Sequence, residues 1–587
     1  MAGPPSWRVV NDAAERAFDA GVRQDLPAMV ARCEALWRSD PQGLKAGFDQ
    51  ARRCGDLKAV EAMAGVLGRH DALDPEGQVA LVQALMAQSR FAEAAEGFEH
   101  PLIRHLGSAR IIYGRAQALA GAGRFQDALD AAERALAARP GHGNTERLRE
   151  RLRVLAPLQA WQDELANGSD PQTLIEGCLD LGAREAARGV AVRLMADPAG
   201  LSAEARLSLA ELALQVCSAE AVRAFLASIP ADGSDRRQRL DVACDVLAGA
   251  PAAHCQVSPS PDADKGLRIW CALACEAAGD LPSAIRQLSA IAEEDKRDAD
   301  VRGALARVVG RRVLDDVRPH FRPGGEGRIV NLVVFNDEFA LLRMHLEEMA
   351  PFVDRFVIVE AGQTFMGADK PLHFQENRAQ FADFEDRITH LAIPRFPEEL
   401  TTAWARDFYQ RDMAIAAAQD LCGQEDYILA TDTDELVDGR ALQGFTGDYA
   451  CLHLVVSRFF LNYRMVAGSP KGSRPASLII KARYLMDQGI SYARFYLARR
   501  WAHAQVIRDA GWHFTSVNDA DRIALKLGSY AHQEQVKARF RTPEHFRQIL
   551  ERLRSGDFEP GWERVALDER MPDYVRRNQA ALAALIL

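Results

Sequence analysis

The sequence predicts a protein of the α + α/β class, with an N-terminal superhelix of helical repeats followed by a doubly wound α/β domain. The chain has 587 residues, which is too long for one compact core. Up to about residue 325 it is rich in Ala, Leu and Arg at helical spacing, and it holds one of the ten Tyr and seven of the 25 Phe. Beyond that point, short apolar runs alternate with amphipathic segments, which is typical of a parallel sheet with crossover helices.

The composition is that of an ordinary globular protein. Hydrophobic residues make up 48% of the chain, charged residues make up 26%, and the formal net charge is −10. An acidic chain argues against a protein that coats nucleic acid, because such binding needs a surplus of Lys and Arg. No apolar run reaches the roughly 18 residues of a membrane-spanning helix, and the N-terminus lacks the pattern of a secretory signal. The ten Cys form no CxxC pair, so we expect buried thiols and a cytoplasmic location.

The clearest repeat unit runs from Ala109 to Pro140. Within it, Gly123 lets the chain turn between two helices, Phe125 fills the groove between them, and the final proline ends the second helix. Phe91 and Leu57 precede Phe125 at intervals of 34 residues. This spacing resembles the tetratricopeptide repeat family.

The resemblance is clearest over roughly residues 10–155 and continues in degenerate form to about residue 312. We therefore expect a repeat domain over residues 1–312, a Pro- and Gly-rich linker over 313–328, and an α/β domain with C-terminal helices over 329–587. Stacked repeats of this kind present a concave face. That face either recognises an acceptor or protein partner, or serves as a dimerisation or scaffolding arm without a ligand.

The second half alternates strands and helices. Continuous apolar runs, as expected for strands buried on both faces, predict strands at residues 327–336, 355–362, 388–394 and 426–435. Helical spacing predicts helices at residues 337–349 and 401–421. The alternation implies a parallel sheet, in which ligands bind beyond the carboxyl ends of the strands.

The fourth predicted strand ends in Asp432, Asp434 and Glu435. Because residues two apart on an extended chain point the same way, Asp432 and Asp434 can jointly face a divalent cation. Carboxylate oxygens with coordination left open for phosphate suit Mg²⁺ or Mn²⁺. An Asp-x-Asp pair alone is a weak signal, since acidic turn residues are common, but its place directly after an apolar strand strengthens it.

Acidic residues also follow the first two strands. Asp337 and Glu338 come after the first, and Glu360 ends the second. Asp337 and Glu338 either contact a ligand at this edge of the sheet or cap the helix that follows.

Three segments together resemble glycosyltransferase family 17, which includes the β-1,4-mannosyl-glycoprotein N-acetylglucosaminyltransferases. They are the run from Phe335 to Phe374, the acidic segment Asp432–Leu436, and the segment Gly511–Ser516. The resemblance covers roughly Ile329 to Gly556, less than half of the chain. It implies a GT-A-like fold, a nucleotide-sugar donor with UDP-GlcNAc expected, a glycan or protein acceptor, a divalent metal (Mn²⁺ or Mg²⁺), and inversion at the anomeric carbon.

The resemblance also implies roles for individual residues. We expect Asp432, Asp434 and His513 as metal ligands, and Glu435, Glu360 and His513 as catalytic residues. Most of the donor-binding residues are expected because their positions match the family's segments. Arg411 is expected because it lies on a helix before the acidic strand. The residues expected to bind the donor are Asp337, Glu338, Asp432, Trp512, Lys526, His532 and Arg411.

Several alternatives remain open at these positions. Inversion needs one carboxylate as a base, and the sequence does not choose between Glu435 and Glu360. His513 either joins the metal and diphosphate or is a core histidine beside Trp512, which more readily packs or stacks on a sugar than takes part in chemistry. Arg411 either reaches the donor or pairs with surface acids.

Three functions from different classes fit these observations. The first is a metal-dependent inverting glycosyltransferase whose repeat domain recruits the acceptor or a partner. The second is a repeat scaffold with a transferase-like domain that binds a nucleotide sugar without turning it over. The third is another enzyme on an α/β sheet, such as a nucleotidyltransferase or a metal-dependent phosphohydrolase.

Overall fold

We describe the protein from a computed structural model. The structure describes residues 7, 10–11, 13–14, 26–54, 56–156, 171–198, 201–230, 233–251, 254, 259–296, 298–443, 445, 447–466, 473–497, 505–529 and 540–587. The chain divides into two compact units, Met1–Ala278 and Gly279–Leu587, which are described separately.

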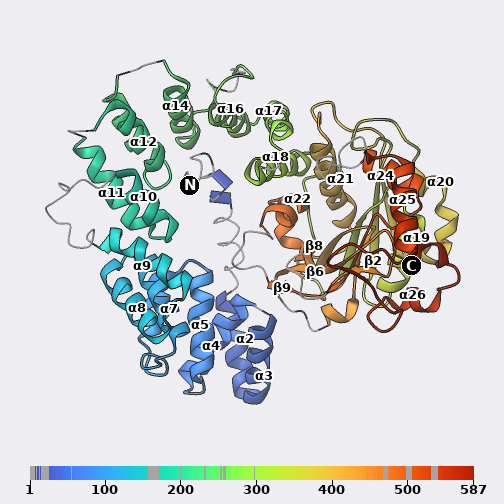
Figure 1. The fold of residues 1–587 in the computed structure, drawn as a ribbon, viewed down its shortest axis with the longest axis horizontal. Coiled ribbons are helices and arrows are strands. Elements are labelled where there is room, and N and C mark those ends of the chain that lie inside the picture. The colour runs from blue at the N-terminus through green and yellow to red at the C-terminus, as the bar shows by residue number, and fades with distance from the viewer. Residues whose placement is uncertain are drawn as a thin grey trace. The chain divides into compact units, whose positions relative to one another are not determined.

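The first unit consists of helices over the residues that the structure describes (Figure 1). Consecutive helices pack on one another, as α7 does on α8 and α5 on α6. The helices are α2 (Leu26–Ser39), α3 (Pro41–Cys54), α4 (Leu57–Arg69), α5 (Pro75–Ala87), α6 (Phe91–Phe98), α7 (Ala109–Gly121), α8 (Phe125–Ala138), α9 (Gly143–Leu155), α10 (Pro171–Asp180), α11 (Arg184–Ala196), α12 (Ala203–Ala213), α13 (Ala219–Ala227), α14 (Asp235–Leu247) and α16 (Lys265–Ala277).

Helix starts in this unit follow the spacing seen in the sequence. Helices α4, α6 and α8 begin at Leu57, Phe91 and Phe125, which lie 34 residues apart. The turn between α7 and α8 contains Gly123 at φ +76°, a left-handed conformation that glycine adopts without strain. A Cβ atom on Gly121 would lie 2.3 Å from the Phe91 ring, so the glycine is what lets α7 approach that aromatic side chain.

The second unit is built on a sheet of 11 strands. Its main path runs in the order β11-β7-β6-β8-β4-β1-β2-β3, with β10 pairing to β5 and β6, and β9 pairing to β6. The strands are β1 (Ile329–Val334), β2 (Arg355–Ala361), β3 (Ile388–Ile393), β4 (Tyr427–Asp432), β5 (Glu435–Val437), β6 (Tyr449–Arg458), β7 (Tyr463–Met465), β8 (Ser473–Lys481), β9 (Gln505–Ile507), β10 (Gly511–Thr515) and β11 (Trp562–Arg564).

Strands β4, β1, β2 and β3 are adjacent and parallel. They are the four strands predicted from the sequence. The other half of the sheet is mixed, because β8 pairs antiparallel to both β4 and β6. The predicted class, an N-terminal helical region followed by an α/β unit, is therefore confirmed, and the sheet is mixed rather than wholly parallel.

Helices cover both faces of the parallel strands. Helix α19 (Phe339–Met349) packs on the face that carries Asn331 and Val333, where the His345 side chain contacts Asn331. Helix α21 (Ala403–Ala418) packs on β1, β2 and β3, and its Gln410 donates to the carbonyl of Val359 at 3.0 Å. The remaining helices of this unit are α17 (Leu281–Glu294), α18 (Ala299–Val317), α20 (His373–Glu376), α22 (Ile490–Tyr492), α24 (Ala520–Ser529), α25 (Pro543–Arg554) and α26 (Asp573–Arg577).

Helices α17 and α18 belong to the second unit, whereas the sequence predicts a repeat domain that extends to residue 312. Helix α18 packs on α21, and it continues to Val317, inside the segment predicted as a linker. Across both units, the described residues include no helix with the length and apolar character needed to cross a membrane.

Candidate functional site

The acidic segment that follows β4 is fixed to the neighbouring strand. Strand β4 ends at Asp432, and the chain then turns before β5 begins at Glu435. Thr433 lies in this turn and donates through its backbone N–H (3.3 Å) and its hydroxyl (2.7 Å) to the carbonyl of Val334, the last residue of β1. The turn therefore lies at the carboxyl edge of the parallel strands, where ligands of such sheets bind.

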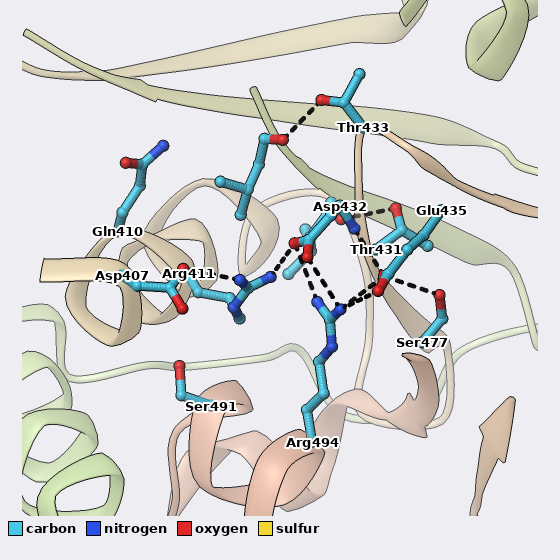
Figure 2. Close-up of polar contacts among 12 residues, drawn as sticks. Asp407, Gln410, Arg411, Thr431, Asp432, Thr433, Glu435, Ser477, Ser491 and Arg494 are labelled. Carbon is cyan, nitrogen blue, oxygen red and sulfur yellow. Dashed lines mark hydrogen bonds and ion pairs between the residues drawn. The ribbon is translucent and has the colours of Figure 1, made fainter. Parts of the chain in front are cut away.

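Two buried arginines bind Asp432 (Figure 2). Arg494 donates to both carboxylate oxygens at 3.2 Å, and Arg411, from α21, donates to Oδ1. Arg411 is itself held by Asp407 at 2.8 Å. Burial alone would raise the pKa of Asp432, but the charges of Arg411 and Arg494 outweigh it and hold that pKa far below its ordinary value. Asp432 is therefore ionised and paired.

Glu435 is buried and saturated with hydrogen bonds. Arg494 donates to both of its carboxylate oxygens at 2.6 Å, Ser477 donates at 3.2 Å, and the backbone N–H of Asp432 donates at 3.0 Å. Burial raises the pKa of this carboxyl. The residue is 3% exposed, so its contacts support a role in fixing the acidic turn.

Arg494 was not found by sequence reasoning, although it joins Asp432 to Glu435. It lies in a π-helical segment, Ala493–Leu497, that directly follows α22. Short π-helical turns are rare and are frequent at functional sites. The guanidinium groups of Arg494 and Arg411 both lie over the ring of Phe495, at 5.1 and 5.2 Å from its centroid.

Asp434 contacts a different set of side chains. Its Oδ2 accepts from the ammonium of Lys526 at 2.7 Å, and its Oδ1 lies 3.8 Å from Nε2 of His513. His513 is on β10, where it lies opposite Glu435 of the adjacent strand β5. The backbone N–H of Phe514 donates to the Asp434 carbonyl at 2.8 Å, which ties β10 to the acidic turn.

Helix α24 contributes two cations to the acids after β1. Lys526 lies 3.0 Å from Glu338, and Arg522 lies 2.9 Å from Asp337. Glu338 is the N-cap residue of α19, but its side chain makes no capping bond. Asp337 and Glu338 therefore face α24 rather than closing the start of their own helix. The charges of Asp434 and Glu338 outweigh burial and raise the pKa of Lys526 above its ordinary value.

Glu360, the residue before the last of β2, lies inside the unit rather than in an open site. Its carboxylate accepts from the backbone N–H groups of Phe374 (3.0 Å) and Gln375 (2.8 Å), and it contacts His390 at 2.9 Å. It is fully buried. Burial would raise its pKa, but these hydrogen bonds prevail and lower it. The contacts support Glu360 as the anchor of the start of α20.

Lys370, in the loop after β2, is a further cation that the sequence did not indicate. Burial lowers the pKa of its ammonium, against the opposing charges of Glu360, Asp337 and Glu338. Of the acids whose charge acts on Lys370, Glu338 also pairs with Lys526.

Trp512 lies in the hydrophobic core, 5% exposed, with its indole N–H donating to the carbonyl of Arg570 at 2.9 Å. Its contacts are those of a packing residue. His532 lies outside the described residues. The structure thus brings together Asp434, His513, Lys526 and Glu338, and places Asp432, Glu435 and Arg411 in a neighbouring network around Arg494.

A buried hydrogen-bond network joins α19, β1 and β4 next to the acidic turn. His345 of α19 bonds Asn331 at 2.7 Å, and Asn331 in turn donates to Thr431 at 2.9 Å. Burial lowers the pKa of His345 to about 4, so its ring is neutral near pH 7. This network holds β1 and β4 in register directly before the turn.

The side chains at this site suit a divalent cation only in part. Both oxygens of Asp432 face guanidinium groups, and no cluster of three or more His, Cys, Asp or Glu arranged for a metal occurs among the described residues. Asp434 and His513 form an oxygen–nitrogen pair at a separation that one ion can bridge. Mg²⁺ and Mn²⁺ sites in nucleotide-dependent enzymes use one or two carboxylates and take further ligands from substrate phosphates, so this pair fits such an ion.

The region that contains this site is similar to a known protein family. Residues 320–556 match the sequence model of glycosyltransferase family 17. The β-1,4-mannosyl-glycoprotein 4-β-N-acetylglucosaminyltransferases of Rattus norvegicus and Homo sapiens are each 27% identical to this chain over 231 residues, covering 34% of this chain and 42% and 43% of their own lengths. The Mus musculus protein of the same name is 23% identical over 231 residues, covering 34% of this chain and 42% of its own length.

The resemblance expected from the three sequence segments is thereby confirmed for the second half of the chain. The chain spans less than half the length of the curated relatives that it matches.

Proposed function

We propose that the second unit is a glycosyltransferase that moves a sugar, GlcNAc, from UDP-GlcNAc to a glycan or protein acceptor, with inversion at the anomeric carbon. The observation that carries the proposal is the match of residues 320–556 to glycosyltransferase family 17. That range contains the acidic turn after β4 together with Arg411, Arg494 and Lys526. We further propose that the unit has a GT-A-like arrangement, with the donor at the carboxyl edge of the parallel strands.

The chemistry requires that negative charge on the leaving diphosphate be stabilised. Preorganised cations are the usual means, and we propose Lys526, which pairs with Asp434, and Lys370, in the loop after β2, for this purpose. A Mn²⁺ or Mg²⁺ ion held by Asp434 and His513 would supply Lewis-acid stabilisation of the diphosphate when bound.

In this proposal, neither of the two carboxylates expected as the base has that role. Glu435 and Glu360 are both buried, and their oxygens are occupied by Arg494 and by backbone N–H groups respectively. A base must reach the acceptor hydroxyl within hydrogen-bond distance. We therefore propose Glu435 and Glu360 as positioning residues that fix the turn after β4 and the start of α20.

For the first unit we propose a tetratricopeptide-like array that recruits the acceptor or a protein partner. A groove of about 1290 Å³ lies along α3, α4, α5, α7 and α9, with Tyr113, Arg110 and Arg139 in its lining. The double variant Arg110→Glu, Arg139→Glu should show lower transfer to a macromolecular acceptor and unchanged transfer to a small sugar acceptor. Equal loss on both acceptors would contradict a recruiting role.

Calorimetric titration of nucleotide sugars with and without Mn²⁺, followed by an assay of nucleotide release and sugar transfer, tests the catalytic proposal. We expect UDP-GlcNAc to bind and to be turned over. Asp434→Asn should lower turnover by about 10²-fold or more, as removal of a key electrostatic group does. Binding without transfer would instead support a nucleotide-sugar-binding scaffold, and release of a monophosphate without transfer would support a phosphohydrolase or nucleotidyltransferase.

A further inference from the structure

We infer that Lys526 is an exchangeable placeholder for the divalent cation at Asp434: it neutralises that carboxylate in the donor-free protein and leaves it when the diphosphate binds with an ion held by Asp434 and His513. This inference rests on the proposed function, because it concerns the same site. It predicts that the protein without nucleotide binds divalent metal weakly, and that metal and donor bind together.

The position of the ammonium supports the inference. Lys526 Nζ lies 2.7 Å from Oδ2 of Asp434 and 3.0 Å from Oε1 of Glu338, so it bridges two carboxylates that come from different strand ends. Both carboxylate side chains are 10% exposed, and the lysine side chain is 24% exposed. An ammonium between two carboxylate oxygens neutralises them as a metal ion would. It supplies one positive charge, however, whereas a divalent ion supplies two.

The charge balance around Lys526 leaves room for the larger charge. Among the described residues, the three carboxylates of Asp337, Glu338 and Asp434 form ion pairs with the cations of Lys526 and Arg522, besides the imidazole of His513 near Asp434. A cavity of about 10 Å³ is lined in part by Asp337, Glu338, Arg522 and Lys526. Such a volume holds about one water, so the acidic cluster is not packed solid.

The chemistry of the side chain also distinguishes Lys526 from the arginines of the neighbouring network. Arg494 and Arg411 are 4% and 6% exposed, and each is locked between two carboxylates. Lys526 is a point charge on a flexible stem in the last turn of α24, and it can swing without moving the helix. Once released by a metal ion, its ammonium would be free to contact the incoming diphosphate.

The alternative is that Lys526 is a structural ion pair with no bearing on metal. The two interpretations predict opposite effects when the lysine is removed. A structural lysine, once removed, would disorder the acidic cluster and weaken any metal site there. A placeholder, once removed, would leave Asp434 and Glu338 uncompensated, and metal would bind more tightly.

The test is titration of Mn²⁺ into the nucleotide-free full-length protein, with free Mn²⁺ measured by electron paramagnetic resonance. We expect Lys526→Met to lower the Kd for Mn²⁺ by about tenfold, because the ion no longer displaces two charge-assisted hydrogen bonds. Lys526→Arg, which keeps the charge, should bind no more tightly than the unmodified protein. Arg547→Met removes a nearby exposed charge that pairs with Asp521 and Glu544, and it serves as the control for a general change in net charge.

The gain should be lost in the double variant Asp434→Asn, Lys526→Met, which would locate the ion at Asp434. An unchanged or higher Kd in Lys526→Met would overturn the placeholder role, as would an equal gain in Arg547→Met. Binding of UDP-GlcNAc, measured in parallel at saturating Mn²⁺, separates the two proposals: if it binds to the unmodified protein while the Kd for Mn²⁺ does not respond to Lys526→Met, only the placeholder role fails. Absence of nucleotide-sugar binding to the unmodified protein would count against the proposed function itself.

Discussion

Replacing Arg494 with methionine should destabilise the sheet unit far more than replacing an exposed arginine. The guanidinium is 4% exposed and holds Glu435, whose side chain is also 4% exposed, as well as Asp432. Without it, and among the residues that the structure describes, Glu435 becomes a buried carboxyl with no opposing charge in contact, and Asp432 keeps only Arg411. Removal of one partner from a buried ion pair costs about 3–5 kcal/mol.

The assay is differential scanning calorimetry of the full chain. For a unit of this size, a loss of about 3–5 kcal/mol corresponds to a fall of roughly 5–8 °C in the midpoint of the affected transition. Arg547→Met is the matched control, because that arginine and its partner Asp521 are 49% and 69% exposed. An exposed pair contributes about 0–1 kcal/mol, so the control should shift the midpoint by no more than about 2 °C.

A double-mutant cycle isolates the pair itself. Glu435→Gln keeps the shape of the side chain and removes its charge, so the double variant with Arg494→Met no longer buries an unpaired carboxylate. The two losses should therefore not add, and the coupling should be about 1–3 kcal/mol. The reasoning is refuted if Arg494→Met costs less than about 1 kcal/mol, or if the two single losses sum to that of the double variant.

Three further predictions concern the same unit. Burial raises the pKa of Asp412 to about 7, so the folded state retains a proton that the unfolded state releases near pH 4; the free energy of unfolding should fall as the pH rises from about 4 to 7, and Asp412→Asn should flatten that fall in melts taken across this range. Gly511 has φ +145°, and a Cβ there would lie 2.1 Å from the Leu436 carbonyl oxygen, so Gly511→Ala should cost at least about 2 kcal/mol in urea unfolding, whereas Gly528→Ala, with nothing within 4 Å, should not destabilise. Trp512→Phe loses the bond to the Arg570 carbonyl and should cost about 1 kcal/mol without changing the affinity for the donor; weaker donor binding would show that the indole contacts the sugar.

The four parallel strands could be predicted from the sequence because they are buried on both faces. Residues 327–336 were expected to form a strand, and β1 spans Ile329–Val334, with four of its six residues buried. A strand of this kind appears as an unbroken apolar run, and its ends are marked by the first charged residues. The alternation with α19 and α21 then implies parallel pairing, since a crossover helix returns the chain to the same edge.

The mixed half of the sheet could not be predicted in the same way. Strand β8 comes after β6 in the chain but inserts between β6 and β4. Which pair of strands it joins depends on packing between segments far apart in sequence, and local propensity does not specify such long-range pairing. The unit boundary has a similar origin, because the assignment of α17 and α18 depends on tertiary contacts such as that between α18 and α21.

Arg494 illustrates why much of a site escapes sequence reasoning. Its partners Asp432 and Glu435 lie 62 and 59 residues earlier in the chain. A basic residue in an amphipathic segment is usually solvated, and no local pattern indicates that this one is buried against two carboxylates. The π-helical geometry of Ala493–Leu497 is also a tertiary effect. The acids could be found because they follow a recognisable strand, whereas the cations that bind them could not.

The expectation that Asp432 and Asp434 would share one cation depended on the alternation of an extended chain. That alternation holds only while the strand lasts, and β4 ends at Asp432. Past that residue the chain turns, and the two aspartates reach different cations: Asp432 reaches two buried arginines, while Asp434 reaches a partly exposed lysine. The consequence is a division between a fixed charge network, which holds the turn in place, and an exchangeable one, which can accept a ligand. The two networks depend on each other. Asp434 can exchange Lys526 for a metal ion without moving only if its backbone is held in place, and the bonds of Arg494 and Arg411 to the acidic turn hold it.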